Sequence, residues 1–148
     1  MKKSLWISAL ICATTVIAIA QSKNATPDVV KSAFKKTYPQ ATQVKYEKEG
    51  TDYEVGFVLG GKNMSAVYNA SGGLLETEEP VKTSQLPASV MSYYNAHYKG
   101  VAIKETAKIV NSKGETTYEV GTKKKDMIFD ANGKFLKEEL KGKEDEKD

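Results

Sequence analysis

The 148-residue chain contains no arginine, and its single cysteine, Cys12, lies close to the N-terminus. Without arginine the chain lacks the side chain that binds phosphate or carboxylate in a bidentate manner. The formal charge of +3 falls to +1 if Lys2 and Lys3 are removed with the N-terminal segment. A chain so close to neutrality lacks the basic footprint of a nucleic-acid-binding protein. We therefore expect no nucleic-acid partner.

Histidine is almost absent as well, because His97 is the only one. A lone histidine without cysteines cannot form the usual ligand shell of a transition metal. His97 falls beside the apolar stripe of a predicted helix, which favours a surface position over a role as general base or metal ligand. No motif supplies a nucleophile or an oxyanion donor. We expect no catalytic residues, no metal site and no cofactor, and hence no enzyme.

Residues 1–20 have the pattern of a secretory signal peptide. Lys2 and Lys3 precede a mostly apolar run from Leu5 to Ala18, and Ala18-Ile19-Ala20 is a small-x-small cleavage motif. The run is short for a membrane span, which needs ~20 apolar residues. Cleavage predicts a periplasmic or secreted chain without integral membrane association. Lipidation of Cys12 is an alternative, although the preceding residues lack the leucine and the small residue that are usual there.

One four-residue motif occurs twice in the remaining chain, as Tyr53-Glu54-Val55-Gly56 and as Tyr118-Glu119-Val120-Gly121. A second shared element follows each copy, at 67–72 and at 128–133. Repetition of this kind indicates tandem structural units. The predicted organisation is a signal peptide at 1–20, a first repeat at 21–81, a second repeat at 82–140 and a disordered charged tail at 141–148.

The spacing between the two shared elements predicts a β-hairpin in each repeat. A turn at Gly60-Gly61 suits positive φ and would pair Val55 with Ala66. A tip at Lys123-Lys124 would pair Val120 with Met127 in the second repeat. Residues then alternate between an apolar, aromatic face and a more polar face, which fixes the register. The same register pairs Phe57 with Met64, Tyr53 with Tyr68, and Tyr118 with Phe129.

A short amphipathic helix is predicted before the strands of each repeat. Thr26 is a candidate N-cap, Pro27 suits the first turn, and Pro39 ends the first helix. Pro87 and Gly100 bound the second helix in the same way. The tyrosines on these helices fit a helix–sheet core better than a carbohydrate-stacking surface. The expected buried stripes comprise Val30, Ala33, Phe34 and Tyr38 in the first helix, and Val90, Tyr93, Tyr94 and Tyr98 in the second.

Two further strands complete each repeat, one before the hairpin and one after it. They are predicted at 43–48 and 74–81 in the first repeat, and at 102–110 and 134–140 in the second. The connection between the repeats is too short for a free linker. The expected fold class is α+β, a tandem repeat of one helix followed by four antiparallel strands, forming one extended sheet with the helices on one face.

The sequence resembles the PepSY-like proteins, a family of secreted bacterial proteins related in fold to the β-lactamase-inhibitor protein. The resemblance rests on Leu86-Pro87, Val90 and Tyr98, together with the Tyr-Glu-Val motif and Phe129-Asp130-Ala131-Asn132-Gly133. It implies a tandem repeat whose sheet is covered by helices on one face and open, often concave, on the other. In the inhibitor relatives the open face docks on an enzyme. The resemblance brings no catalytic or cofactor-binding residues.

The more polar face of the hairpins is the candidate binding surface, with another envelope protein as the expected partner. Apolar residues there surround two equivalent glutamates, a mixture that suits a protein contact. Glu54 and Glu119 could also form an acid–base pair, although a solvated strand face is favoured. A small-ligand or glycan-binding module is the alternative function. The candidate contact residues are Glu54, Val58, Val67, Glu119 and Ile128.

Two other motifs have alternative interpretations. Asp130-Ala131-Asn132-Gly133 and Asn69-Ala70-Ser71-Gly72 look like the start of a calcium loop, but Lys141 and Pro80 stand where an EF-hand needs its final carboxylate. Hairpin turns are therefore favoured. The Lys123-Lys124-Lys125 run could attract anionic lipid or glycans, but solvated lysines at a strand edge are favoured.

Overall fold

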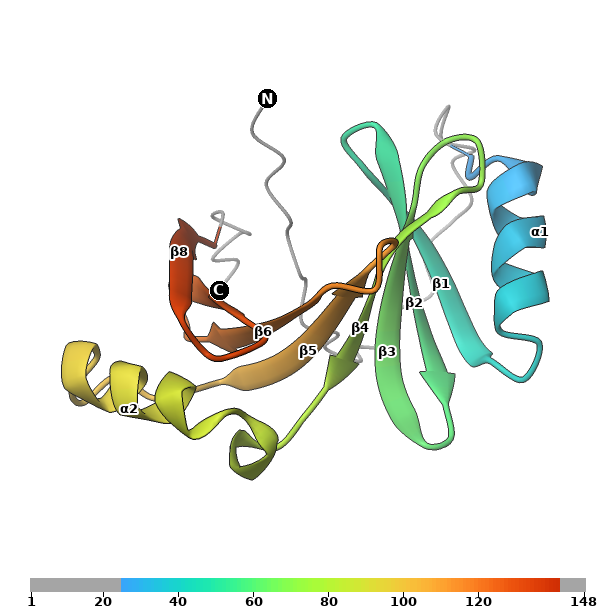
Figure 1. Cartoon of the computed structure of the whole chain (residues 1–148). Helices are drawn as coiled ribbons and strands as arrows, with labels where there is room; N and C mark the ends of the chain where they lie inside the picture. The colour runs from blue at the N-terminus through green and yellow to red at the C-terminus, as the bar shows by residue number, and fades with distance from the viewer. Residues whose placement is uncertain (1–24, 142–148) are drawn as a thin grey trace, which may run out of the picture.

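The computed structural model describes residues 25–141 as one eight-stranded antiparallel sheet with two helices (Figure 1). The strands follow each other across the sheet in chain order, so each pairs with its neighbour in sequence. This confirms the predicted fold class. The elements are α1 (Asp28–Thr37), β1 (Thr42–Glu49), β2 (Asp52–Leu59), β3 (Lys62–Tyr68), β4 (Leu74–Pro80), the 3-10 turn η1 (Thr83–Gln85), α2 (Ala88–His97), β5 (Glu105–Asn111), β6 (Thr116–Gly121), β7 (Lys125–Asp130) and β8 (Phe135–Leu140).

The two helix-plus-four-strand units share this sheet through the pairing of β4 with β5. That pairing runs from Glu76 opposite Asn111 to Pro80 opposite Ala107. Both predicted hairpin registers are confirmed, because Val55 lies opposite Ala66 and Val120 lies opposite Met127. Gly60 and Gly61 have φ values of 58° and 79°, as a two-residue turn between β2 and β3 requires.

Both helices lie on the same face of the sheet. Directly paired residues point to the same face, so the pairing can be followed from one repeat to the other. Val55 belongs to the core under α1 and Val120 to the core under α2, and both are fully buried. If the two helices lay on opposite faces, the strand pairing would place these two valines on opposite faces. The series of partners runs Val55, Ala66, Thr77, Val110 and Thr116, and Thr116 shares its face with Val120.

Each helix packs on its own hydrophobic cluster. In the first unit Phe34 of α1 contacts Phe57, with ring centroids 5.0 Å apart in an edge-on arrangement. In the second unit Tyr93 of α2 stacks on Phe135 at 4.7 Å. The predicted helix stripes and hairpin faces are therefore confirmed as core. The buried residues are Val30, Phe34, Tyr53, Val55, Phe57, Ala66 and Tyr68 in the first cluster, and Leu86, Val90, Tyr94, Val120, Met127 and Phe129 in the second.

Two glycines with positive φ allow each helix to approach a turn of the sheet. A Cβ on Gly72 would lie 3.0 Å from the Val29 carbonyl oxygen of α1. A Cβ on Gly133 would lie 3.0 Å from Pro87 Cβ, just before α2, and only 2.1 Å from Ser89 Oγ. The close approach explains why glycine occupies the same place in both repeats.

Three local predictions need correction or lie outside the described chain. Thr26 does not cap α1, because the helix begins at Asp28 with Pro27 at its N-cap and no side-chain bond there. The predicted strand from residue 102 begins only at Glu105, since the Tyr94 hydroxyl donates to the Val101 carbonyl and holds the preceding loop. The predicted signal peptide lies outside the described residues. No helix within 25–141 is long and apolar enough to cross a membrane.

Candidate functional site

The five predicted contact residues all occupy the face of the sheet opposite the helices, which we call the open face. Glu54 lies opposite Val67 on β2 and β3, and Glu119 lies opposite Ile128 on β6 and β7. Val58 shares the face of Glu54 because the two are four residues apart on one strand. The shared face follows from the strand pairing, whereas the role of these residues in binding stays a prediction.

Glu54 and Glu119 do not form an acid–base pair. They lie on β2 and β6, which are separated by three strands in the sheet. At a strand spacing of about 4.8 Å, four spacings correspond to roughly 19 Å. Carboxylates this far apart cannot act together on one bond.

The surroundings of Glu119 differ from the solvated strand face that was predicted. Its side chain is only 2% exposed, whereas Glu54 is half-buried. The expectation of solvation is therefore wrong for Glu119. Strand alternation identifies the face on which a residue lies, but the size of the neighbouring side chains decides whether water reaches it.

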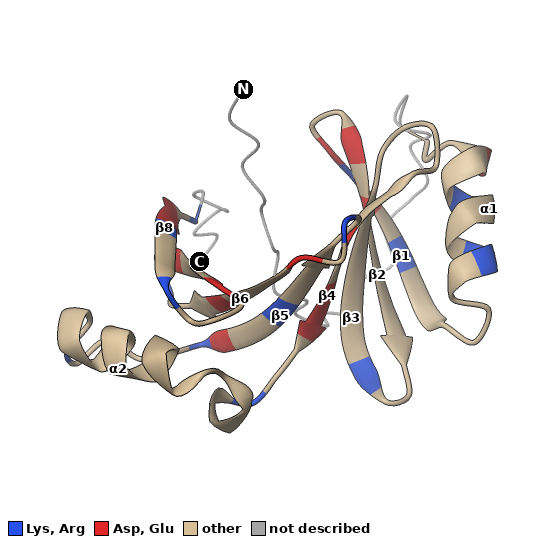
Figure 2. Ribbon diagram, in the orientation of Figure 1, with Lys and Arg blue, Asp and Glu red and all other residues tan. Residues whose placement is uncertain are grey.

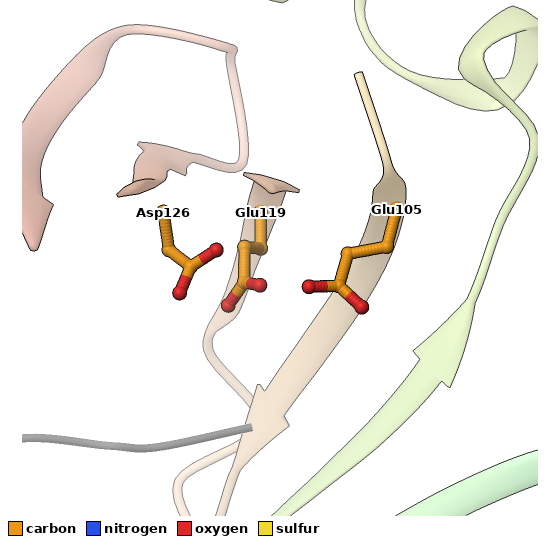
Figure 3. A group of neighbouring side chains, drawn as sticks. All are labelled: Glu105, Glu119 and Asp126. Atoms are coloured by element: carbon orange, nitrogen blue, oxygen red, sulfur yellow. The ribbon is translucent and has the colours of Figure 1, made fainter. Parts of the chain in front are cut away.

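Three carboxylates converge around Glu119, as Figure 3 shows. Glu105 from β5, Glu119 from β6 and Asp126 from β7 each offer an oxygen atom, and these atoms lie within 4.8 Å of one another. We call this group the carboxylate cluster. Sequence reasoning missed Glu105 and Asp126. The predicted pairing of Val120 with Met127 already placed Gly121 opposite Asp126, so that half of the cluster could have been found.

Gly121 provides the space in which the cluster forms. It lies between Glu105 and Asp126, its partners on the two neighbouring strands. A Cβ at this position would lie 2.6 Å from Glu105 Cγ, 2.8 Å from Glu105 Oε1 and 3.0 Å from Asp126 Oδ1. The two acidic side chains therefore extend over the glycine, where a side chain would separate them.

Burial and mutual repulsion dominate the electrostatics of the cluster. Loss of solvation, followed by the nearby Glu78 and the other cluster carboxylates, raises the pKa of Glu119 to about 9. Lys141 opposes this effect. Its ammonium group contacts Glu105 and lies 3.1 Å from Asp126 Oδ1.

Lys141 was predicted as the first residue of a disordered tail. Its backbone N–H donates to the Lys124 carbonyl at 2.9 Å, and its side chain joins the carboxylate cluster. The other residues of the predicted tail lie outside the described part of the chain.

Acidic residues also occur on β4 (Figure 2), and strand pairing places Glu76 and Glu78 of that strand on the open face together with Glu54. Loss of solvation raises the pKa of Glu78 to about 8, and neighbouring carboxylates add to the shift. It likewise raises the pKa of Glu54 and that of Glu76 to about 7. Ser65 limits the shift at Glu54 by hydrogen bonding to it. The open face thus combines several crowded carboxylates with the half-buried apolar residues Val67 and Ile128.

The remaining candidates behave as local structure. His97 is exposed and stacks on Tyr93 with ring centroids 4.2 Å apart, which confirms its surface position. The preferred interpretation of the calcium-like motifs is also confirmed. Asp130 Oδ1 accepts backbone N–H bonds from Asn132 and Lys134, both at 2.9 Å. In the equivalent turn of the first repeat, Asn69 Oδ1 accepts backbone N–H bonds from Ser71 and Gly73.

The lysine run at the second hairpin divides between the tip and the sheet. Lys123 and Lys124 form the exposed tip, as predicted. Lys125 belongs to β7, and its ammonium lies 2.7 Å from Glu138 Oε1 on β8. The run is therefore no uniform cationic patch.

The described residues thus form two tandem helix-plus-four-strand units that share one uninterrupted antiparallel sheet, with both helices on one face and acidic residues on the other. The family model described as "Putative beta-lactamase-inhibitor-like, PepSY-like" matches residues 14–76 and 57–137. The chain belongs to this PepSY-like family. A comparison with curated proteins finds no match.

Two solved structures with the same fold come from Bacteroides species. A protein of Bacteroides eggerthii DSM 20697 described as a putative periplasmic protein is 18% identical, with a TM-score of 0.67 over 79% of this chain and 90% of that one. A BLIP-like protein of Bacteroides fragilis NCTC 9343 is 23% identical, with a TM-score of 0.60 over 83% of this chain and 92% of its own. At these identities the likeness establishes the fold alone.

Proposed function

We propose that this chain is a non-enzymatic binding protein of the bacterial envelope, periplasmic or secreted, which docks on another envelope protein through its open face. One observation carries the proposal: half-buried aliphatic side chains and crowded carboxylates share a face that no described helix covers. Val58 and Val67 in the first repeat and Ile128 in the second provide the apolar part. The extracytoplasmic location is supported by the Bacteroides eggerthii structure, which is described as a putative periplasmic protein.

The chemistry of the face favours a partner with a basic surface. Glu54, Glu76 and Glu78 lie on neighbouring strands around Val67, and their pKa values are raised first by loss of solvation and then by neighbouring carboxylates, whose repulsion a cationic partner would relieve. Complementary charge increases the rate of association and its dependence on salt. Inhibition of an enzyme by this face is the specific form of the proposal that the family's description suggests.

The glycan-binding alternative has less support. Stacking on sugars requires exposed aromatic rings in a cleft. The aromatic residues of the described strands lie on the helix-covered face, for example Tyr53 and Phe57 of β2 and Phe129 of β7. The strand positions of the open face carry polar, small and aliphatic residues instead, among them several glutamates and the lysines Lys45 and Lys137.

An affinity-capture experiment with a matched control tests the proposal. The chain is immobilised, exposed to envelope extract of the native organism, and compared with Glu54→Lys/Val67→Lys on the open face. The control, Asp28→Lys/Glu115→Lys, also adds two lysines, at exposed positions outside that face. We expect a specific protein to be retained by the original chain and the control but lost with the open-face variant. The Kd measured between the purified chain and the retained protein should increase for the open-face variant but not for the control.

Two results would contradict the proposal. Retention that survives both variants would place the contact elsewhere on the molecule. Loss of binding with the control to the same extent would show that added charge, and not the open face, controls retention. Circular dichroism of each variant confirms that the chain is folded before binding is compared.

A further inference from the structure

The carboxylate cluster lies at the second-repeat end of the open face, and of its members only Glu119 is among the five predicted contact residues. We propose that Glu105, Glu119 and Asp126 form a binding site for a hard divalent cation of the calcium class. The inference stands independently of the proposed protein partner, because it concerns the residues at one end of the sheet alone.

The geometry of the cluster fits such an ion without movement of the backbone. Calcium binds oxygen ligands at 2.3–2.6 Å, so ligands on opposite sides of the ion are about 4.6–5.2 Å apart. The three carboxylate oxygens already lie within 4.8 Å of one another. They project from three adjacent strands, whose hydrogen-bonded pairing fixes their origins. Figure 3 shows the three side chains directed towards a common region.

An unpartnered buried atom is a second observation that points to a ligand. Glu119 is 2% exposed, and its Oε1 atom has no hydrogen-bond partner among the described residues. A buried carboxylate oxygen without a hydrogen-bond donor destabilises the folded state, because the free energy of its lost hydration is not recovered. A cation at the centre of the cluster would supply the missing interaction, which no described side chain provides.

The ammonium group of Lys141 would compete with the ion for the centre of the carboxylate cluster. Its ammonium contacts Glu105 and lies 3.1 Å from Asp126 Oδ1, so one positive charge already lies beside two of the three acidic side chains. A divalent ion at the centre would be repelled by this ammonium. Binding therefore requires the Lys141 side chain to move away, and the lysine lowers the affinity for the ion.

The chemistry of the ligands selects the class of ion. All three side chains offer carboxylate oxygen, which suits calcium, magnesium or manganese, whereas copper and zinc favour histidine or cysteine. His97 lies on α2 and is not part of the cluster. Magnesium retains several of its waters, while calcium accepts many protein oxygens with flexible geometry. Convergent carboxylates in a buried setting therefore favour calcium.

The first repeat supplies a matched control within the same chain. Strand pairing places Lys45 and Ser65 on either side of Gly56, just as Glu105 and Asp126 flank Gly121. The first repeat therefore has one carboxylate, Glu54, where the second repeat has three. The Glu54→Gln variant removes one acid from an equivalent position without touching the proposed site.

Calorimetric titration of the purified full chain with CaCl₂, after treatment with a chelator, tests the inference. In about 0.1 M KCl, surface charges are largely screened beyond ~10 Å. We expect one ion per chain, with a Kd between about 10⁻⁵ and 10⁻³ M. Glu119→Gln should weaken binding by about tenfold or more. Glu54→Gln should leave the Kd unchanged, and Lys141→Met should strengthen binding.

Thermal unfolding with and without CaCl₂ gives an independent readout, since an ion that binds the folded state raises Tm. The inference is overturned if neither heat nor a Tm shift occurs up to about 10 mM CaCl₂, far above the expected Kd. It is also overturned if Glu119→Gln and Glu54→Gln reduce the response equally, because the ion would then only screen the acidic face. Circular dichroism establishes that both glutamine variants remain folded.

Discussion

The two repeats place different chemistry on the same scaffold. Glu54 and Glu119 occupy equivalent positions in the Tyr-Glu-Val-Gly motif, yet Glu54 is half-buried and Glu119 is 2% exposed. Nothing would lie within 4 Å of a Cβ on Gly56, whereas a Cβ on Gly121 would collide with the carboxylate cluster. The helix-covered faces are alike and preserve the fold. The open faces have diverged, and the function is expected to reside there.

A charge placed in the apolar core should give the largest loss of stability. Comparing the same substitution in both repeats also tests whether the two helix-covered faces are alike. Val55 and Val120 are both 0% exposed. Val55→Asp and Val120→Asp should each lower the free energy of unfolding by about 3 kcal/mol or more, because each places an unpaired carboxylate in the core. Urea denaturation followed by circular dichroism measures the change.

Val58→Asp is the matched control for these core variants. Val58 lies on the same strand as Val55 but on the open face, where it is half-buried. We expect a loss of less than about 1 kcal/mol. If Val58→Asp proved as damaging as Val55→Asp, the assignment of the two faces would be wrong.

Two alanine variants should give an intermediate change in stability and should distinguish the open face of the first repeat from that of the second. Gly121→Ala should cost about 1–2 kcal/mol, because the new Cβ displaces Glu105 and Asp126. Gly56→Ala should be neutral, or stabilise by up to about 1 kcal/mol, because the unfolded chain loses freedom. Chemical denaturation of both proteins in parallel gives the difference. Equal effects at the two glycines would refute the special packing at Gly121.

The smallest expected effect concerns the pH dependence of stability in the first repeat. The pKa values of Glu54 and Glu76 rise from 4.5 to about 7 on folding. Between these pH values the unfolded chain loses protons that the folded chain retains, so the free energy of unfolding falls as pH rises through this window. The carboxylates that face Glu54 are Glu47, Glu49 and Glu76, and each adds to its shift.

Glu54→Gln/Glu76→Gln should therefore flatten the decline in stability between pH 4.5 and about 7. Urea denaturation at a series of pH values across this window provides the measurement. The exposed Glu115→Gln serves as the control and should leave the slope unchanged. An unaltered slope in the double variant would mean that the crowding of these two carboxylates does not influence stability.

The repeated motif made most of the fold predictable from sequence. The alternation around Val55 and Val120 identified the core face, and the positions of Gly60 and Gly61 fixed one hairpin register. These features are local, with period and turn chemistry that a short stretch of sequence contains. The absence of a free linker between the repeats correctly predicted one continuous sheet.

The carboxylate cluster was much less accessible to sequence reasoning. Its formation depends on the pairing of β5 with β6, which brings Glu105 opposite Gly121. The predicted strand at 102–110 was three residues early at its start, and no local signal showed that Glu105 would extend over the glycine. The burial of Glu119 depends on packing between three strands, which alternation along a single strand cannot report.

The order of the strands in the sheet also bears on how the chain folds. Every strand pairs with the next one along the sequence, so no pairing has to wait for a distant segment. Most of the connections are tight turns, and the longest, between β4 and β5, contains α2. A topology of such low contact order closes only short loops during folding, which favours faster folding than in a β-sandwich with crossed connections. Each repeat can assemble its hairpins locally before the β4–β5 pairing unites the two halves.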